Sequence, residues 1–308
     1  MASPVFQLPS PVTQIVSPLL DDRQLQLFIK RDDLIHPVIS GNKWRKLKYN
    51  LQQAKAEQQP CLLTFGGAWS NHIHATAAAG YYFGFNSIGI IRGETPKTLS
   101  ATLQDAQDWG MQLHFVSREQ YRHKTEADFL TRLQQQFGRF YLLPEGGSNS
   151  LAMQGCAEIL SELNEKYDVV CVDCGTGTTL AGVIFGNKIQ AHILGFSVLK
   201  GGDFLTHNVQ TMLDNASCNY LNWHINSDYH FGGYAKASAE LFEFIKTFNQ
   251  QHGIQLEPVY SGKMFFGLFD LIDKGYFKPG SRILAIHGGG LQGLRGYKLE
   301  QPATTQNR

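Results

Sequence analysis

The sequence lacks a long apolar run and a concentration of one charge. Its 308 residues hold 27 Lys and Arg against 26 Asp and Glu, a formal net charge of +1, with no block of one sign. This balance predicts neither a nucleic-acid-binding surface nor an anionic-membrane surface. No window approaches the apolar length of a membrane span. The first residues lack a basic segment followed by an apolar one, so we expect no signal peptide and a cytoplasmic protein.

A cysteine framework is also missing. Five cysteines are spread through the chain without the spacing of a disulfide-rich domain, which fits reduced thiols in the cytosol. Cys171 and Cys174 form a C-x-x-C pattern, but they lie in the apolar stretch 168–174, which we interpret as a buried strand. Side chains three residues apart on a strand point to opposite faces. We therefore expect both to pack in the core, and we expect no metal site.

What the sequence does contain is an alternation of strand-length apolar runs and amphipathic stretches. The predicted strands are residues 25–30, 61–65, 87–92, 113–116, 141–143, 169–172, 192–198 and 283–286. The predicted helices between them are residues 42–57, 71–83, 99–109, 151–163, 237–250 and 263–274. This order predicts an α/β fold in which largely parallel strands are covered by helices on both faces.

Four of the predicted strands run directly into glycine. The glycine turns are residues 66–67, 146–147, 175–177 and 288–290. In open α/β sheets, ligands bind outside the carboxyl ends of the strands, and glycine there lets the backbone approach a ligand closely. The four turns therefore predict a single cleft rimmed by backbone amides.

Lys43 is the first candidate for chemistry. It follows Gly41 and Asn42 in the stretch 40–46, where a turn passes into a helix. The N-terminal end of a helix disfavours positive charge, and a lysine that loses its proton can form a Schiff base with an aldehyde cofactor. The alternative interpretation is a surface lysine in a basic first turn.

A second candidate is the loop between the predicted strand 169–172 and the helix that follows. It consists of Gly175, Thr176, Gly177, Thr178 and Thr179. Backbone amides and hydroxyls at a helix start can bind the oxygens of a small phosphomonoester. A dinucleotide fingerprint fits less well, because the third glycine, Gly182, comes late and the expected acidic residue is missing. A purely structural turn is the remaining alternative.

A third candidate, residues 66–72, also joins a strand end to a helix start. Ser70 or Asn71 would cap the helix in the structural interpretation. In the functional one, free amides, the Ser70 hydroxyl and His72 form a seat for a carboxylate. His72 and His74 are two residues apart and cannot share a metal as a four-spaced pair would. Tyr260, in the stretch 257–263, could either pack or face the cleft.

The order of these motifs resembles one family. The matching segments are GNK at 41–43, GGAWSNH at 66–72, PEGGSN at 144–149, GTGTT at 175–179 and PVYSGK at 258–263. They resemble the pyridoxal-phosphate enzymes that include 1-aminocyclopropane-1-carboxylate deaminase and D-cysteine desulfhydrase, over residues 30–293. The resemblance implies a two-lobed fold type II enzyme, with residues 1–50 and 155–308 forming a large domain and 51–154 a small one.

The resemblance implies roles around the cofactor, pyridoxal 5'-phosphate. Lys43 corresponds to the Schiff-base lysine that also moves the proton at Cα, and Lys46 to a phosphate contact. Asn71 corresponds to the residue that bonds the cofactor's phenolic oxygen, and residues 175–179 to the phosphate loop.

Further roles concern the substrate, a small amino acid. Ser70 and Asn71, with the amides around His72, correspond to the region that binds the substrate carboxylate and supplies a nucleophile. Tyr234 and Tyr260 correspond to two tyrosines that face the substrate. A homodimer is expected because the family usually forms one.

Two positions help to choose within the family. The deaminases have an acidic residue where this chain has Ser261, near the cofactor's ring nitrogen, and they tend to have glutamine in place of His72. A hydroxyl leaves the ring nitrogen closer to neutral than a carboxylate does, which suits loss of a thiolate better than ring opening. The desulfhydrases typically have a threonine where this chain has Gly288, and their loop after Tyr234 also differs.

We therefore predict deamination with β-elimination, D-cysteine desulfhydrase-like, giving pyruvate, ammonia and hydrogen sulfide. The alternative within the family is 1-aminocyclopropane-1-carboxylate deaminase, which opens the ring to 2-oxobutanoate and ammonia. Alternatives of other classes are a metabolite-binding protein without turnover and a nicotinamide-dependent oxidoreductase.

Overall fold

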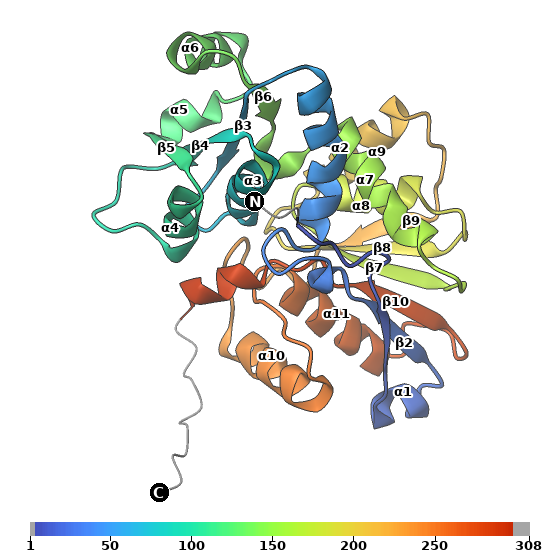
Figure 1. Ribbon diagram of the computed structural model, residues 1–308. Coiled ribbons are helices and arrows are strands. Elements are labelled where there is room, and N and C mark those ends of the chain that lie inside the picture. The colour runs from blue at the N-terminus through green and yellow to red at the C-terminus, as the bar shows by residue number, and fades with distance from the viewer. Residues whose placement is uncertain (1–3, 298–308) are drawn as a thin grey trace, which may run out of the picture.

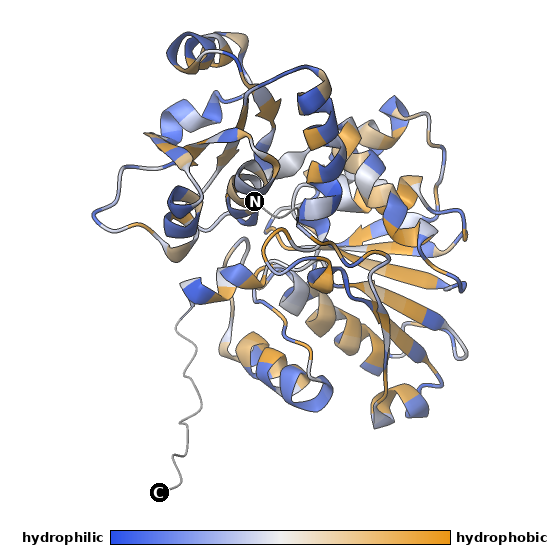
Figure 2. Cartoon of the chain, viewed as in Figure 1, coloured by the Kyte–Doolittle hydropathy of each residue, from blue (hydrophilic) through white to orange (hydrophobic). Residues whose placement is uncertain are grey.

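A computed structural model describes residues 4–297 as an α/β fold with two sheets (Figure 1). The larger sheet has the strand order β1-β2-β10-β7-β8-β9 and is parallel except for the β1–β2 pair. Its strands are β1 (Val12–Ile15), β2 (Gln26–Lys30), β7 (Val169–Cys174), β8 (His192–Ser197), β9 (Trp223–Asn226) and β10 (Arg282–Ile286). The central strands are apolar on both faces, as Figure 2 shows, because helices cover both.

The smaller sheet is entirely parallel and has the order β5-β4-β3-β6. Its strands are β3 (Cys61–Gly66), β4 (Asn86–Arg92), β5 (Met111–Val116) and β6 (Tyr141–Leu143). Its helices are α3 (Asn71–Phe83), α4 (Ala101–Asp108), α5 (Arg118–Arg122) and α6 (Ala127–Phe137). The predicted α/β fold with largely parallel strands and flanking helices is thus confirmed. The strands form two sheets rather than one.

Two apolar cores lie on opposite faces of the larger sheet. One contains α10 (Ala239–His252) and α11 (Ser261–Asp273), together with Cys171. The other contains α7 (Ser150–Ser161), α8 (Thr178–Phe185) and α9 (Phe204–Asn215), together with Cys174. The two cysteines therefore point to opposite faces, as predicted.

Helices α2 (Asn42–Ala56) and α7 connect the two sheets, and the predicted domain boundaries at 51 and 154 fall inside them. The apolar face of α2 packs on the smaller sheet. On its other side the fully buried Arg45 pairs with Asp32 at 2.9 Å and with Glu162 at 2.5 Å, which ties α2 to the larger sheet. A buried charge needs such partners, so the start of α2 is held firmly between the sheets.

The remaining elements are short. They are α1 (Pro18–Asp22) and the 3-10 helices η1 (Asp32–Leu34), η2 (Glu145–Gly147) and η3 (Leu291–Gly296). Among residues 4–297, no helix combines the length and the apolar character needed to cross a membrane.

Candidate active site

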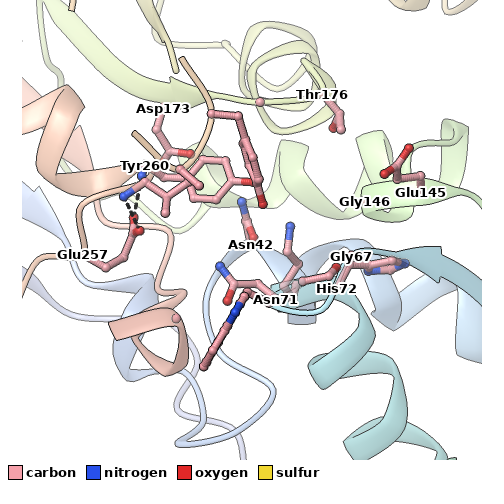
Figure 3. A pocket seen from close by; sticks show the side chains of 18 of the residues that line it. Asn42, Gly67, Asn71, His72, Glu145, Gly146, Asp173, Thr176, Glu257 and Tyr260 are labelled. Atoms are coloured by element: carbon pink, nitrogen blue, oxygen red, sulfur yellow. Dashed lines mark hydrogen bonds between the residues drawn. The ribbon is translucent and has the colours of Figure 1, made fainter. Parts of the chain in front are cut away.

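A cavity of about 670 Å³ lies where strand ends of the two sheets face each other (Figure 3). Such a volume is typical of a small-molecule site. Glycines from three of the predicted strand-end turns line it, namely Gly67, Gly146, Gly175 and Gly177. The fourth turn, Gly288 to Gly290, lines a recess of about 20 Å³ that shares Asn42, Lys43, Asn71, Asp173 and Tyr260 with the cavity. The glycine turns therefore meet at one cleft, as expected.

Lys43 lies at the start of α2 and lines both the cavity and the recess. Gly41, with φ +60°, makes this possible, because a Cβ there would lie 1.9 Å from the carbonyl oxygen of Gly288. Within residues 4–297, the Lys43 amine has no hydrogen-bond partner. Burial, and then the charge of Lys46, lower the pKa of Lys43 to about 7. The lowered pKa agrees with the prediction, but burial rather than the helix end is its main cause.

Lys46 lies one turn further along α2 and also lines the cavity. Its Nζ donates a hydrogen bond to the carbonyl of Gly146 at 3.1 Å. Burial lowers the pKa of Lys46. The amine is therefore close to the cavity and still has two further donor positions.

The loop after β7 leads into a helix start with no side-chain cap. Gly177 is the N-cap of α8 in the left-handed conformation, with φ +84°. Within the described residues, the amides of Thr178 and Thr179 have no backbone acceptor. The Thr178 hydroxyl donates to Ser148 at 2.6 Å and does not line the cavity, whereas Thr176 and Thr179 do. Such a helix start is an anion site.

Gly182 has a structural role rather than a dinucleotide-binding one. A Cβ at this position, inside α8, would lie 2.4 Å from the Cβ of Cys156 and 2.6 Å from the carbonyl oxygen of Met153, both on α7. The glycine is needed for close packing of α7 and α8. This finding removes the third glycine of the dinucleotide interpretation.

The start of α3 faces the same cavity. The Ser70 oxygen accepts a hydrogen bond from the amide of Ile73 at 3.2 Å, so Ser70 is the helix cap, and it also lines the cavity. Asn71 accepts a hydrogen bond from Gln292. His72 is 2% exposed, and neither ring nitrogen has a partner within the described chain.

Burial lowers the pKa of His72 well below its usual value, and the nearby Lys43 and Lys46 lower it further. The ring is therefore neutral at physiological pH, with one nitrogen that can donate. His74 points elsewhere and pairs with Asp105 at 3.0 Å. The two histidine rings therefore have different neighbours.

Tyr260 and Tyr234 both line the cavity, with ring centroids 6.0 Å apart at 72°. Burial raises the pKa of Tyr260 well above its usual value, so the phenol retains its proton. Gly175 is required here, because a Cβ would lie 2.9 Å from the Tyr260 ring. The phosphate loop and Tyr260 thus pack against each other.

Ser261 lies outside the cavity lining. It is fully buried, and its oxygen accepts a hydrogen bond from the amide of Glu257 at 3.0 Å. Glu257 lines the cavity (Figure 3), but its carboxylate accepts hydrogen bonds from the amides of Val259, Tyr260 and Ser261 at 2.7–2.8 Å. Burial raises the pKa of Glu257 to about 7.

Four charged cavity residues were not predicted as site residues from the sequence: Arg92, Glu145, Asp173 and Glu257. Arg92 is the last residue of β4, and Glu145 follows β6, so both stand at strand ends. Asp173 is an acidic residue inside the apolar strand β7, and that contrast was the available signal.

A model of the family described as pyridoxal-phosphate dependent enzyme matches residues 9–289. The chain belongs to this family. It is also 34% identical to the bifunctional D-cysteine desulfhydrase/1-aminocyclopropane-1-carboxylate deaminase, mitochondrial, of Arabidopsis thaliana, over 96% of this chain and 80% of that protein. The resemblance found in the motifs is therefore confirmed, and pyridoxal phosphate is the cofactor of this family.

Solved structures agree with this assignment. A crystal structure described as an ACC deaminase homologue superposes with a TM-score of 0.81 at 28% identity, over 95% of this chain and 92% of that one. A hydrogen sulfide-producing enzyme of Fusobacterium nucleatum superposes with a TM-score of 0.65 at 14% identity, over 92% and 96%, and shows the fold alone. The fold is that of the type II pyridoxal-phosphate enzymes.

The residues present fit this cofactor. An unpaired amine with a pKa of about 7 suits an aldehyde, and an uncapped glycine-rich helix start suits a phosphate. Lys43 would hold the aldehyde carbon, and Gly175 to Thr179 with Lys46 would hold the phosphate.

Proposed function

We propose that this enzyme deaminates a small amino acid by β-elimination, as D-cysteine desulfhydrase does. D-Cysteine and water would give pyruvate, ammonia and hydrogen sulfide. The observation that carries the proposal is the unpaired amine of Lys43, with a pKa of about 7, between two helix starts that suit two different anions.

When bound, pyridoxal phosphate supplies an electron sink that stabilises negative charge at the substrate Cα. Lys43 is the residue that takes the Cα proton, because its amine is buried, unpaired and easily deprotonated. The start of α3 orients the substrate, since the Ser70 hydroxyl and the neutral His72 ring can both donate to a carboxylate. Asn71 would bond the cofactor's phenolic oxygen.

Tyr260 and Tyr234 are placed to protonate the departing sulfur. Both line the cavity, and burial raises the pKa of both phenols, so each retains its proton until a thiolate develops nearby. Both tyrosines line the same cavity as the start of α3, so one small substrate can reach all of these groups.

The test is a side-by-side assay of D-cysteine, L-cysteine, D-serine and 1-aminocyclopropane-1-carboxylate with the holoenzyme. We expect sulfide release from D-cysteine to be the fastest reaction. No turnover of any amino acid, with bound pyridoxal phosphate, would favour a metabolite-binding protein and reject the proposal.

Ring opening of 1-aminocyclopropane-1-carboxylate to 2-oxobutanoate and ammonia is a second candidate. The Arabidopsis relative has both activities in its name. Ser261, on which the preference for β-elimination depended, lies outside the cavity lining. The same assay decides, because ring opening faster than sulfide release would make this the main activity.

We further propose that the enzyme is a cytoplasmic homodimer in which residues 1–50 with 155–308, and residues 51–154, act as two domains. All five cysteines are free, which suits a reducing compartment. Light scattering of the purified holoenzyme would test the dimer, and a mass of about 34 kDa would contradict it.

A further inference from the structure

Asp173 is a buried carboxylate with no assigned role. It is the second-last residue of β7, just before the phosphate loop, and it lines both the cavity and the recess. Its side chain lies beside Tyr260, on the other side of the cavity from Glu145 (Figure 3). Asp173 is 8% exposed, so the carboxylate faces the cavity rather than bulk solvent.

The other two carboxylates of the cavity already have partners. Glu257 accepts three backbone amides, and Glu145 pairs with Tyr121 at 2.9 Å and with Lys124 at 3.3 Å. Within residues 4–297, no other residue donates a hydrogen bond to the Asp173 carboxylate, although Lys43 and Lys46 are near enough for their charges to act on it. A buried carboxylate is costly without a partner, so Asp173 indicates a group that enters the cavity.

Gly288, at the end of the neighbouring strand β10, borders this carboxylate. A Cβ built on Gly288 would lie 3.4 Å from Oδ2 of Asp173 and 3.5 Å from Nδ2 of Asn42. The Asp173 side chain therefore borders the space that a side chain at position 288 would enter. Asp173 is the acidic residue that lines the recess, together with the glycine turn Gly288 to Gly290.

Pyridoxal phosphate has three polar parts that a protein can bind. They are the phosphate, the aldehyde together with the adjacent phenolic oxygen, and the ring nitrogen, which is para to the aldehyde. The loop 175–179 suits the phosphate, and Lys43 suits the aldehyde. The ring nitrogen would then meet the remaining part of the lining, where Asp173 borders both the cavity and the recess. We propose that the carboxylate of Asp173 binds this ring nitrogen and keeps it protonated.

This inference rests on the proposed function, because it requires pyridoxal phosphate bound through Lys43. Burial raises the pKa of Asp173 because it disfavours the charged carboxylate, and a protonated ring nitrogen beside it would offset that cost. A carboxylate partner makes the ring a strong electron sink. The chemistry then does not depend on Ser261, and ring opening becomes accessible as well as β-elimination.

The test is nuclear magnetic resonance of the holoenzyme loaded with pyridoxal phosphate labelled with ¹⁵N in the ring. We expect the wild-type ring nitrogen to show the shift of a protonated pyridine throughout the pH range in which the protein is folded. Asp173→Asn, which keeps the shape and removes the charge, should move the shift to that of a neutral pyridine. Glu145→Gln, at the other acidic side of the cavity, should keep the wild-type shift.

A neutral ring nitrogen in the wild type, or a protonated one in Asp173→Asn, would overturn the inference. Should Asp173→Asn fail to fold, Asp173→Ser has the same expected shift, and the wild-type spectrum still decides. The imine absorbance of each sample separates the two proposals. If wild type has no imine, the proposed function fails; if the imine is present and the nitrogen neutral, only the role of Asp173 fails.

Discussion

Among the helix starts that face the cavity, those of α8 and α3 have their amides satisfied in different ways. At α8 the cap is Gly177, which has no side chain to accept a hydrogen bond, and within residues 4–297 the amides of Thr178 and Thr179 have no backbone acceptor. At α3 the cap is Ser70, whose oxygen already accepts the amide of Ile73. One start is therefore open and the other is partly satisfied by its own side chain.

The difference separates two kinds of anion. An uncapped start with neighbouring hydroxyls offers several donors, which suits a phosphate with several oxygens. A capped start has fewer free amides, and beside it stands the neutral ring of His72 rather than a cation. That arrangement suits the single carboxylate of an amino acid, which has to leave again after each turnover.

Lys43→Ala should have the largest effect, because it removes the covalent link and leaves both helix starts unchanged. We expect kcat/KM to fall at least about 10³-fold and the imine absorbance to disappear, while pyridoxal phosphate still binds through α8. Lys55→Ala, an exposed lysine on the same helix, is the control and should behave as wild type. Turnover within tenfold of wild type would refute the role of Lys43.

Gly177→Ala tests the open start at α8. Gly177 has φ +84°, a conformation that is strained for alanine, and the added Cβ would lie 2.8 Å from Val209. The loop therefore has to shift. We expect pyridoxal phosphate to bind about 10- to 100-fold more weakly, measured by fluorescence titration of the apoenzyme.

Gly84→Ala is the matched control for this change. Gly84 is the C-cap of α3 and has φ +75°. A Cβ added there would have no atom within 4 Å. The two variants share the backbone strain, and only Gly177 lies in the cavity lining. Equal losses of cofactor affinity would show that α8 has no special role.

Ser70→Ala tests the capped start at α3. Loss of the cap should reduce the free energy of unfolding by about 1 kcal/mol. Loss of the donor to the substrate carboxylate should raise KM about tenfold. Ser238→Ala removes the equivalent cap of α10, which accepts the amide of Leu241 at the same 3.2 Å, away from the cavity. If both variants have the same KM, Ser70 does not bind the substrate carboxylate.

The pH dependence of cofactor loading should show the smallest effect, because it changes no residue. Only the deprotonated amine of Lys43 attacks the aldehyde, and its pKa is lowered to about 7. The rate of imine formation in the apoenzyme should therefore rise as the pH passes upward through about 7 and then level off. Stopped-flow absorbance measures this rate. A rise that continues to about pH 10, as for an ordinary lysine, would show that the amine is not desolvated.

Much of the fold was predictable, because strands and helices differ in the spacing of their apolar residues and glycine marks many of their ends. All eight predicted strands are present, and α2 and α3 begin at the predicted residues. The strands β1 and β9 were not predicted, because both are short and lie at the edges of the larger sheet with few buried side chains.

The candidate site was less predictable where long-range contacts decide. Lys43, Ser70, Asn71, His72, Tyr234 and Tyr260 all line one cavity, as do most residues of the phosphate loop. Asp173 was overlooked, because residues 168–174 were interpreted as a buried core strand, and only the packing of β7 against its neighbours shows that this side chain faces the cavity. The role predicted for Ser261 stays untested, and its hydroxyl lies next to Glu257 instead of the cavity.

The sequence by itself determined which residues could do chemistry, since the glycine turns, the helix starts and the lysine at 43 follow from local patterns. The tertiary structure alone decided how those residues behave. The low pKa of Lys43 requires burial by segments far away in the chain, and the surroundings of the Asp173 carboxylate include Gly288, at the end of the neighbouring strand β10. Desolvation and hydrogen-bond pairing depend on distances in space, and neighbours in the sequence do not set those distances.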